Sequence, residues 1–295
     1  MGLPYSPVEL DHHAFIGDPM TPADRNGGGG GDGDGDEEAG GEDERVPAQD
    51  ADLWRAYWAD VLESGRRLQV ENAAADPLGR WLVAEVPTLV DEHGIGPETL
   101  RADPDGALAA ARRGFEELVN ARDLPGYGDE RYGYGALPVH LTAVGRIRSV
   151  PFVLEDPAAD ANALVTLDGA SVVDNPTRRH EAAVLTYRCP RGHETTVRQP
   201  LLRTWTVETC GDPDCEQGVV PDDARTRGRR VARFTVDGPD GTLPCVAAGR
   251  EAADGFDRLA SARRLHLSGI VRLLVDGSGA LEPTVEVLAA EPTAP

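Results

Sequence analysis

The sequence contains no lysine, so all 29 of its basic residues are arginine. This absence excludes a phosphate-binding loop of the G-x-x-x-x-G-K-[S/T] type, in which the lysine contacts the phosphates. Aromatic residues make up only 5% of the 295 positions, and no run approaches the roughly 20 apolar residues of a membrane-spanning helix. The first residues lack the positive start and apolar stretch of a secretory signal. We therefore expect a soluble, cytoplasmic protein.

Acidic residues are in large surplus, with 51 Asp and Glu and a net charge of -22. Such a balance ordinarily opposes nucleic-acid binding, because phosphates repel it. In molar salt, however, the Debye length is about 3 Å and surplus carboxylates keep a surface hydrated. Abundant Ala, Gly and Val without lysine are typical of a cytosolic protein from an extreme halophile. On this interpretation the charge reflects the solvent and says little about partners.

Three regions differ in their patterns. Residues 1–48 are rich in Gly and acids with little to bury, which predicts a disordered acidic tail. Residues 49–135 have the period of a helical bundle, and residues 136–295 have short alternating strands separated by Asp-Gly turns. The pattern predicts an α+β protein whose helical bundle precedes a β-barrel or sandwich. The helices are expected at 51–71, at 76–94 with an interruption at Pro87, and at 103–122.

Three of the four cysteines lie with a histidine in one short window, as Cys-x3-His, sixteen residues, and Cys-x4-Cys. Zinc in structural sites takes four tetrahedral N or S ligands, usually as two closely spaced pairs on tight turns. In a reducing compartment this pattern favours a metal over disulfides. The alternative is two unrelated pairs of buried or free side chains. The predicted ligands of a structural zinc ion are Cys189, His193, Cys210 and Cys215.

The order of features then becomes specific. VLTYRC enters the first ligand pair, and after the second come VARFTVDG, a loop PDGTLPC and the stretch RRLHLSGIVRLL. This order resembles the N-terminal domain of the archaeal minichromosome maintenance (MCM) replicative helicases. The resemblance covers about residues 50–290. It implies an OB-fold barrel, with a zinc module inserted at about 186–218.

Two departures from that family limit what the resemblance implies. The family continues into an AAA+ ATPase, whose phosphate-binding lysine has no counterpart here. The family also has a long basic hairpin after the SGIV-like strand, where this sequence has VDGSGALEPT at 275–284, without arginine. We therefore expect a module without its own helicase motor and not an enzyme, and we do not carry over the hairpin's DNA contacts.

One basic stretch, ARTRGRRVAR, follows the second ligand pair. Arginine contacts phosphates with a planar fork and can stack on bases, so this stretch predicts a phosphate-binding edge. The alternative is a solvated loop whose arginines pair with nearby acids. Arg198 and Arg203 lie within the inserted module, and Tyr187, Trp205 and Phe234 are the nearest aromatic residues for stacking. The predicted DNA-binding residues are Arg225, Arg227, Arg229, Arg230 and Arg233.

Two functions remain open from the sequence. The first is a DNA-binding protein associated with replication that holds single-stranded or forked DNA. The second is a protein–protein adaptor that docks onto full-length MCM subunits or other replication factors, or associates with itself, without binding DNA. The missing basic hairpin favours the adaptor, and the arginine-rich stretch favours DNA binding.

Overall fold

The computed structural model describes residues 51–77, 79–124, 134–135, 137–174, 176–202, 204–253, 255–275 and 279–293. Contacts divide the chain after Glu44, and every described residue belongs to the unit Arg45–Pro295. The predicted acidic tail lies outside the described residues. Among the described helices, none combines the length and the apolar character needed to cross a membrane.

The N-terminal half is helical, as predicted. Its longest helix, α5, starts where the Asp103 side chain accepts a hydrogen bond from the backbone N–H of Gly106 at 2.8 Å. α5 packs against α1, and Gly114 allows this approach because a Cβ there would lie 2.5 Å from the carbonyl oxygen of Ala51. The helices are α1 (Ala51–Glu63), α2 (Arg67–Ala75), α3 (Val86–Asp91), α4 (Pro97–Ala102) and α5 (Pro104–Ala121).

The helix predicted at 76–94 is wrong over its first half. Strand β1 (Leu82–Glu85) occupies this segment and pairs in parallel with β2 (Val139–Thr142). Alternate residues Leu82 and Ala84 are fully buried, as the two-residue period of a strand requires. Only α3 remains helical, and it begins beside Pro87, which is tolerated in a first turn. A short 3₁₀ turn, Val144–Arg146, follows β2.

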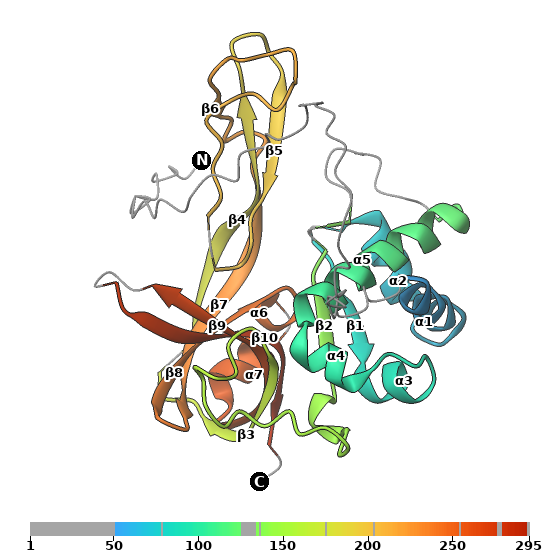
Figure 1. Ribbon diagram of the computed structural model, residues 1–295, viewed down its shortest axis with the longest axis vertical. Helices are drawn as coiled ribbons and strands as arrows, with labels where there is room; N and C mark the ends of the chain where they lie inside the picture. Colours follow the sequence, from blue (N-terminus) through green and yellow to red (C-terminus); the bar gives the residue numbers. More distant parts are fainter. Residues whose placement is uncertain are drawn as a thin grey trace, which may run out of the picture. The chain divides into compact units, whose positions relative to one another are not determined.

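The C-terminal half contains a curled sheet (Figure 1). Five strands run in the spatial order β3-β9-β10-β8-β7, with β8 and β10 parallel and the other neighbours antiparallel. A bridge between Val172 and Val236 brings the end of β3 back to β7. This connectivity is consistent with the predicted OB-fold. The strands are β3 (Leu164–Ser171), β7 (Arg227–Gly238), β8 (Gly241–Ala248), β9 (Arg264–Val275) and β10 (Leu281–Pro292).

Two local features of the barrel differ from the sequence prediction. The segment expected to be a loop, PDGTLPC, is mostly strand β8, in which Pro244 lies opposite Thr235 of β7. Asp168-Gly169 interrupts the regular pairing of β3, an irregularity that the sequence pattern does not indicate, and Gly169 has φ of 65°. Two short helices, α6 (Arg250–Ala253) and α7 (Phe256–Ser261), follow β8 and contribute buried Ala252 and Leu259 to the barrel core.

The helical core continues onto the barrel strands. Ile270 of β9 and Leu288 of β10 are buried in the same apolar cluster as the helices. The carboxylate of Asp105 in α5 receives two hydrogen bonds of 2.6 Å from Arg272 of β9. His140 of β2 is buried, hydrogen-bonds through Nδ1 to the carbonyl oxygen of Leu288 and accepts at Nε2 from the N–H of Arg250. The contacts fix the helices against β9 and β10.

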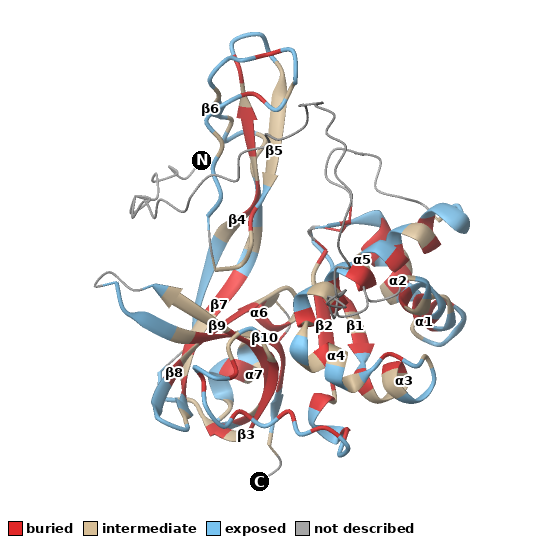
Figure 2. Ribbon diagram, in the orientation of Figure 1, coloured by how far each residue is buried: buried red, intermediate tan, exposed pale blue. Residues whose placement is uncertain are grey.

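Between β3 and β7 the chain forms an excursion built on strand β4 (Thr177–Arg188), which pairs with β7, β5 (Glu194–Arg198) and β6 (Val220–Pro221). We call residues 177–184 of β4, paired with 227–233 of β7, the stem, and residues 185–226 the tip. Figure 2 shows exposed residues along the stem and buried ones in the upper part of β4.

Candidate metal centre and nucleic-acid interface

The first ligand pair sits on the turn between β4 and β5. Cys189 directly follows β4, and His193 directly precedes β5. The N–H of Cys189 donates to the carbonyl oxygen of His193 at 3.1 Å, and the N–H of Gly192 donates back to Cys189 at 2.9 Å. Gly192 has φ of 86°, a conformation that glycine adopts without steric cost. A tight turn of this kind presents both side chains to the same side.

The second pair lies on the loop between β5 and β6. The N–H of Cys210 donates to Gln217 at 2.9 Å, and the N–H of Cys215 donates to Asp212 at 3.0 Å. A bridge between Thr209 and Gly218 closes this loop at its base. The second turn thus faces the first from a separate part of the chain.

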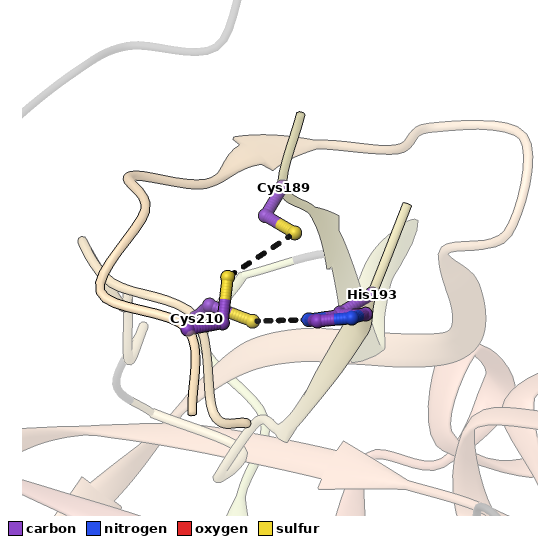
Figure 3. Close-up of side chains that lie close together, drawn as sticks. Cys189, His193 and Cys210 are labelled. Atoms are coloured by element: carbon purple, nitrogen blue, oxygen red, sulfur yellow. Dashed lines mark hydrogen bonds between the residues drawn. The ribbon is translucent and has the colours of Figure 1, made fainter. Parts of the chain in front are cut away.

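The four side chains converge, as the spacing predicts. All four ligand atoms lie within 4.8 Å of one another, and the three cysteines are buried. The Sγ of Cys210 lies 3.7 Å from Nδ1 of His193, and the Sγ atoms of Cys189 and Cys215 are 3.9 Å apart. Figure 3 shows Cys189, His193 and Cys210 pointing toward one another. Tetrahedral zinc bonds imply edges of roughly 3.5–3.8 Å, so this cluster could hold a metal ion.

Backbone groups also favour the thiolate at Cys189. Burial by itself would raise the pKa of this thiol, but hydrogen bonds from the backbone of His193 and Arg191 lower the pKa below its usual value. Metal ligands must be deprotonated to bind, so the turn prepares this sulfur for a cation.

Three of the five predicted DNA-binding arginines make contacts within the excursion: Arg225, Arg229 and Arg233. Arg225 pairs with Glu194 and, at 3.8 Å, with Asp222. Arg233 donates two hydrogen bonds, of 2.8 and 3.1 Å, to Glu181 on the neighbouring strand. Arg225 and Arg233 therefore pair with nearby acids, which was the alternative to phosphate binding.

Arg229 also makes an internal contact, which ties β7 to the tip. Its Nη2 donates to the carbonyl oxygen of Pro200 at 2.6 Å. Burial lowers the pKa of this guanidinium, although it remains far above neutral pH because arginine does not deprotonate in proteins. The side chain is therefore a positioning residue for the loop after β5.

The other two predicted arginines, Arg227 and Arg230, are exposed and have no ion pair within the described part of the chain. The adjacent strand adds two exposed arginines that the sequence analysis missed. Arg179 lies opposite Val231, and Arg178 lies opposite Ala232, with its guanidinium 4.1 Å from the ring centre of Phe256. The basic run TRRH was the available signal. The pairing of β4 with β7 gathers these charges on the stem.

The three aromatic candidates separate clearly. Tyr187 and Phe234 are buried, at 4% and 5% exposure, and so cannot stack on a ligand. Trp205 is 56% exposed, on the loop between β5 and Cys210. Arg198 is exposed on β5 opposite Val184, and Arg203 lies outside the described residues.

The fold is that of a known domain. A solved structure described as the N-terminal domain of an archaeal MCM aligns with a TM-score of 0.60, covering 83% of this chain and 98% of that one, at 12% sequence identity. No family model and no curated protein matches the chain. The resemblance predicted from the sequence is therefore confirmed as a likeness of fold: this chain folds like an archaeal MCM N-terminal domain.

Proposed function

We propose that this protein is an MCM N-terminal-like DNA-binding protein, associated with DNA replication, that holds single-stranded or forked DNA without a helicase motor of its own. One observation carries the proposal. In a chain of net charge -22, the exposed arginines Arg179, Arg227 and Arg230 lie on two paired strands, with Arg179 and Arg227 on one face of this ribbon and Arg230 on the other. Carboxylates pair with Arg225 and Arg233 nearby, but these three make no ion pair within the residues described.

The chemistry of the stem suits phosphates. A guanidinium offers a planar fork of donors that matches phosphate oxygens, and it stays charged at any physiological pH. His180 lies directly opposite Arg230 and is also exposed, so no acidic residue occupies that cross-strand position. Phosphate contacts of this kind fix the register of the strand and carry no base sequence. We therefore expect little sequence preference.

The metal belongs to the proposal as a structural zinc ion held by Cys189, His193, Cys210 and Cys215. Four protein ligands leave no position for water, so the ion would supply stability and no hydrolytic chemistry. By joining the turn after β4 to the loop before β6, the ion would fix the tip. The tip in turn holds Arg225 and Arg229, which flank the exposed arginines.

The test is fluorescence anisotropy of labelled single-stranded and forked DNA, titrated in KCl from moderate to molar concentration. The variant Arg179→Ala/Arg227→Ala/Arg230→Ala is compared with Arg55→Ala/Arg67→Ala/Arg122→Ala, which removes the same charge from exposed positions of the helical half. Three lost single-strand contacts reduce the log–log salt slope by about 2 and affinity by on the order of 100-fold at 0.1 M salt. Equal binding by both variants, or no binding by the wild type at any salt where it stays folded, would overturn the proposal.

The adaptor is the second candidate, favoured by the hairpin of β9 and β10. Its strand ends expose the apolar residues Val275 (46%) and Leu281 (63%), and residues 275–284 contain no arginine. Exposed apolar strand ends suit docking onto a protein, such as an MCM subunit or a second copy of this chain. Sedimentation of a full-length archaeal MCM mixed with either the wild type or the variant Val275→Asp/Leu281→Asp tests the adaptor. A complex that the double variant abolishes, without any DNA binding by the wild type, would replace the first candidate.

A further inference from the structure

Trp205 is an exposed indole whose backbone is rigidly held. Trp54 and Trp58 are fully buried and Trp81 is half-buried, whereas Trp205 is 56% exposed. The buried Gln199 accepts a hydrogen bond from the N–H of Trp205 at 2.8 Å and donates to its carbonyl oxygen at 2.9 Å. A single side chain thus satisfies both backbone groups of Trp205. The indole itself is left to face solvent.

Gln199, which holds the backbone of Trp205, is itself anchored to β4 and β5. Gln199 also donates to the carbonyl oxygen of Val197 at 3.1 Å, and its own N–H donates to Ala183 of β4 at 2.9 Å. Arg229 of β7 holds Pro200 in the same loop at 2.6 Å. The loop bearing Trp205 is therefore tied to β4, β5 and β7 together. Pre-organisation of this kind lowers the entropy lost when a ligand orders a loop.

The same contacts place the loop beside the exposed arginines. Val184 of β4 pairs with Arg227 on one side and with Arg198 on the other, and Ala183 next to it holds Gln199. The anchor of Trp205 therefore lies at the level of the stem where Arg227 emerges. We propose that Trp205 stacks on an unpaired base of a single strand whose phosphates contact Arg227, which lies on the same face of β7 as Arg229. This inference rests on the proposed DNA binding and names the residue that contacts the bases.

Stacking would also allow this acidic chain to bind DNA at high salt, where phosphate contacts are weak. Phosphate contacts weaken steeply as salt rises, and a chain this acidic has few of them to spare. Base–aromatic stacking is driven by contact between π-faces, accepts every base, and does not depend on counterion release. An indole beside the arginines would keep a single strand bound in concentrated salt. A duplex, whose bases are already stacked, would not gain from it.

The test compares the wild type with Trp205→Ala and Trp205→Phe on two labelled strands of equal length, oligo(dT) and a strand carrying abasic sites throughout, at low and at molar KCl. We expect Trp205→Ala to lose about 5- to 150-fold in affinity for oligo(dT), with Trp205→Phe in between and the salt slope unchanged. On the abasic strand the three proteins should bind alike. Metal content and thermal unfolding of each variant check that the tip is intact.

The outcomes separate the two claims. A wild type that binds oligo(dT) through its stem arginines, but is matched by Trp205→Ala on both strands, overturns the stacking role and leaves DNA binding standing. Trp205 would then be assigned to a protein contact. A wild type that binds neither strand at any salt where it stays folded overturns both claims.

Discussion

The barrel and the tip are stabilised by different kinds of interaction. The barrel buries aliphatic and aromatic side chains from five strands, including Val165, Phe234 and Leu267, in one core. The only cluster of buried apolar side chains in the described part of the tip is Cys189, Cys210 and Cys215, with Val219 packed against them. Apolar burial therefore stabilises the barrel, whereas the tip lacks the area to do so. The Cys–His cluster, backbone hydrogen bonds and arginine–carboxylate pairs take the place of that core.

The largest expected effect comes from comparing one cysteine substitution in the tip with one in the barrel. Cys210→Ala should abolish stoichiometric zinc binding and unfold the tip, because metal binding in small zinc domains contributes roughly 10–16 kcal/mol. Cys245→Ala, in the barrel core, should keep the metal and lower the free energy of unfolding by about 1–2 kcal/mol. Elemental analysis gives the metal content, and amide hydrogen exchange shows which region has opened.

The comparison fails if the two substitutions behave alike. A Cys210→Ala protein whose tip amides remain as protected as those of the wild type would show that the tip folds without its ligands. Loss of metal in Cys245→Ala would show that the barrel and the tip unfold as one unit.

A smaller effect concerns His140, where the helices meet the barrel. Burial lowers the pKa of this histidine from 6.5 to about 4, so the unfolded chain binds its proton more tightly than the folded chain. The free energy of unfolding should therefore fall as pH drops from about 6.5 towards 4. This one group accounts for about 2 kcal/mol between pH 7 and pH 5.

Denaturant unfolding at pH 7 and pH 5 measures this loss. His140→Gln should lack that part of the pH dependence, while His180→Gln, at an exposed position of the stem, should keep it. An identical pH dependence in wild type and His140→Gln would contradict the account of a neutral histidine at this junction. Metal content should not differ among the three proteins, since His140 lies in β2.

The barrel was largely predictable, because short runs of strand-favouring residues bounded by turn signals mark β3, β7, β9 and β10. The exceptions have local causes. Pro244 interrupts the signal of β8, yet it fits opposite Thr235. Strand β1 resembles a helix in sequence, because a run of apolar residues has no decisive period, and its pairing with β2 comes from a segment more than fifty residues away.

In the candidate site too, local features were predictable from the sequence and contacts between strands were not. The convergence of the four Cys and His side chains was predictable from spacing, since each short turn positions its own pair. The fate of the arginines was not, because the register of β4 against β7 decides which of them meets a carboxylate. Glu181 meets Arg233, and nothing in ARTRGRRVAR indicates this. The same pairing brings Arg179 beside that stretch.

The central claim is that single-stranded DNA lies along the stem. Amide hydrogen exchange of the zinc-loaded protein, with and without saturating oligo(dT), tests it most directly. The account predicts slower exchange at 177–184, at 227–233 and around Trp205, with the hairpin of β9 and β10 unchanged. Protection confined to that hairpin or to the barrel, with no change on the stem, would contradict it.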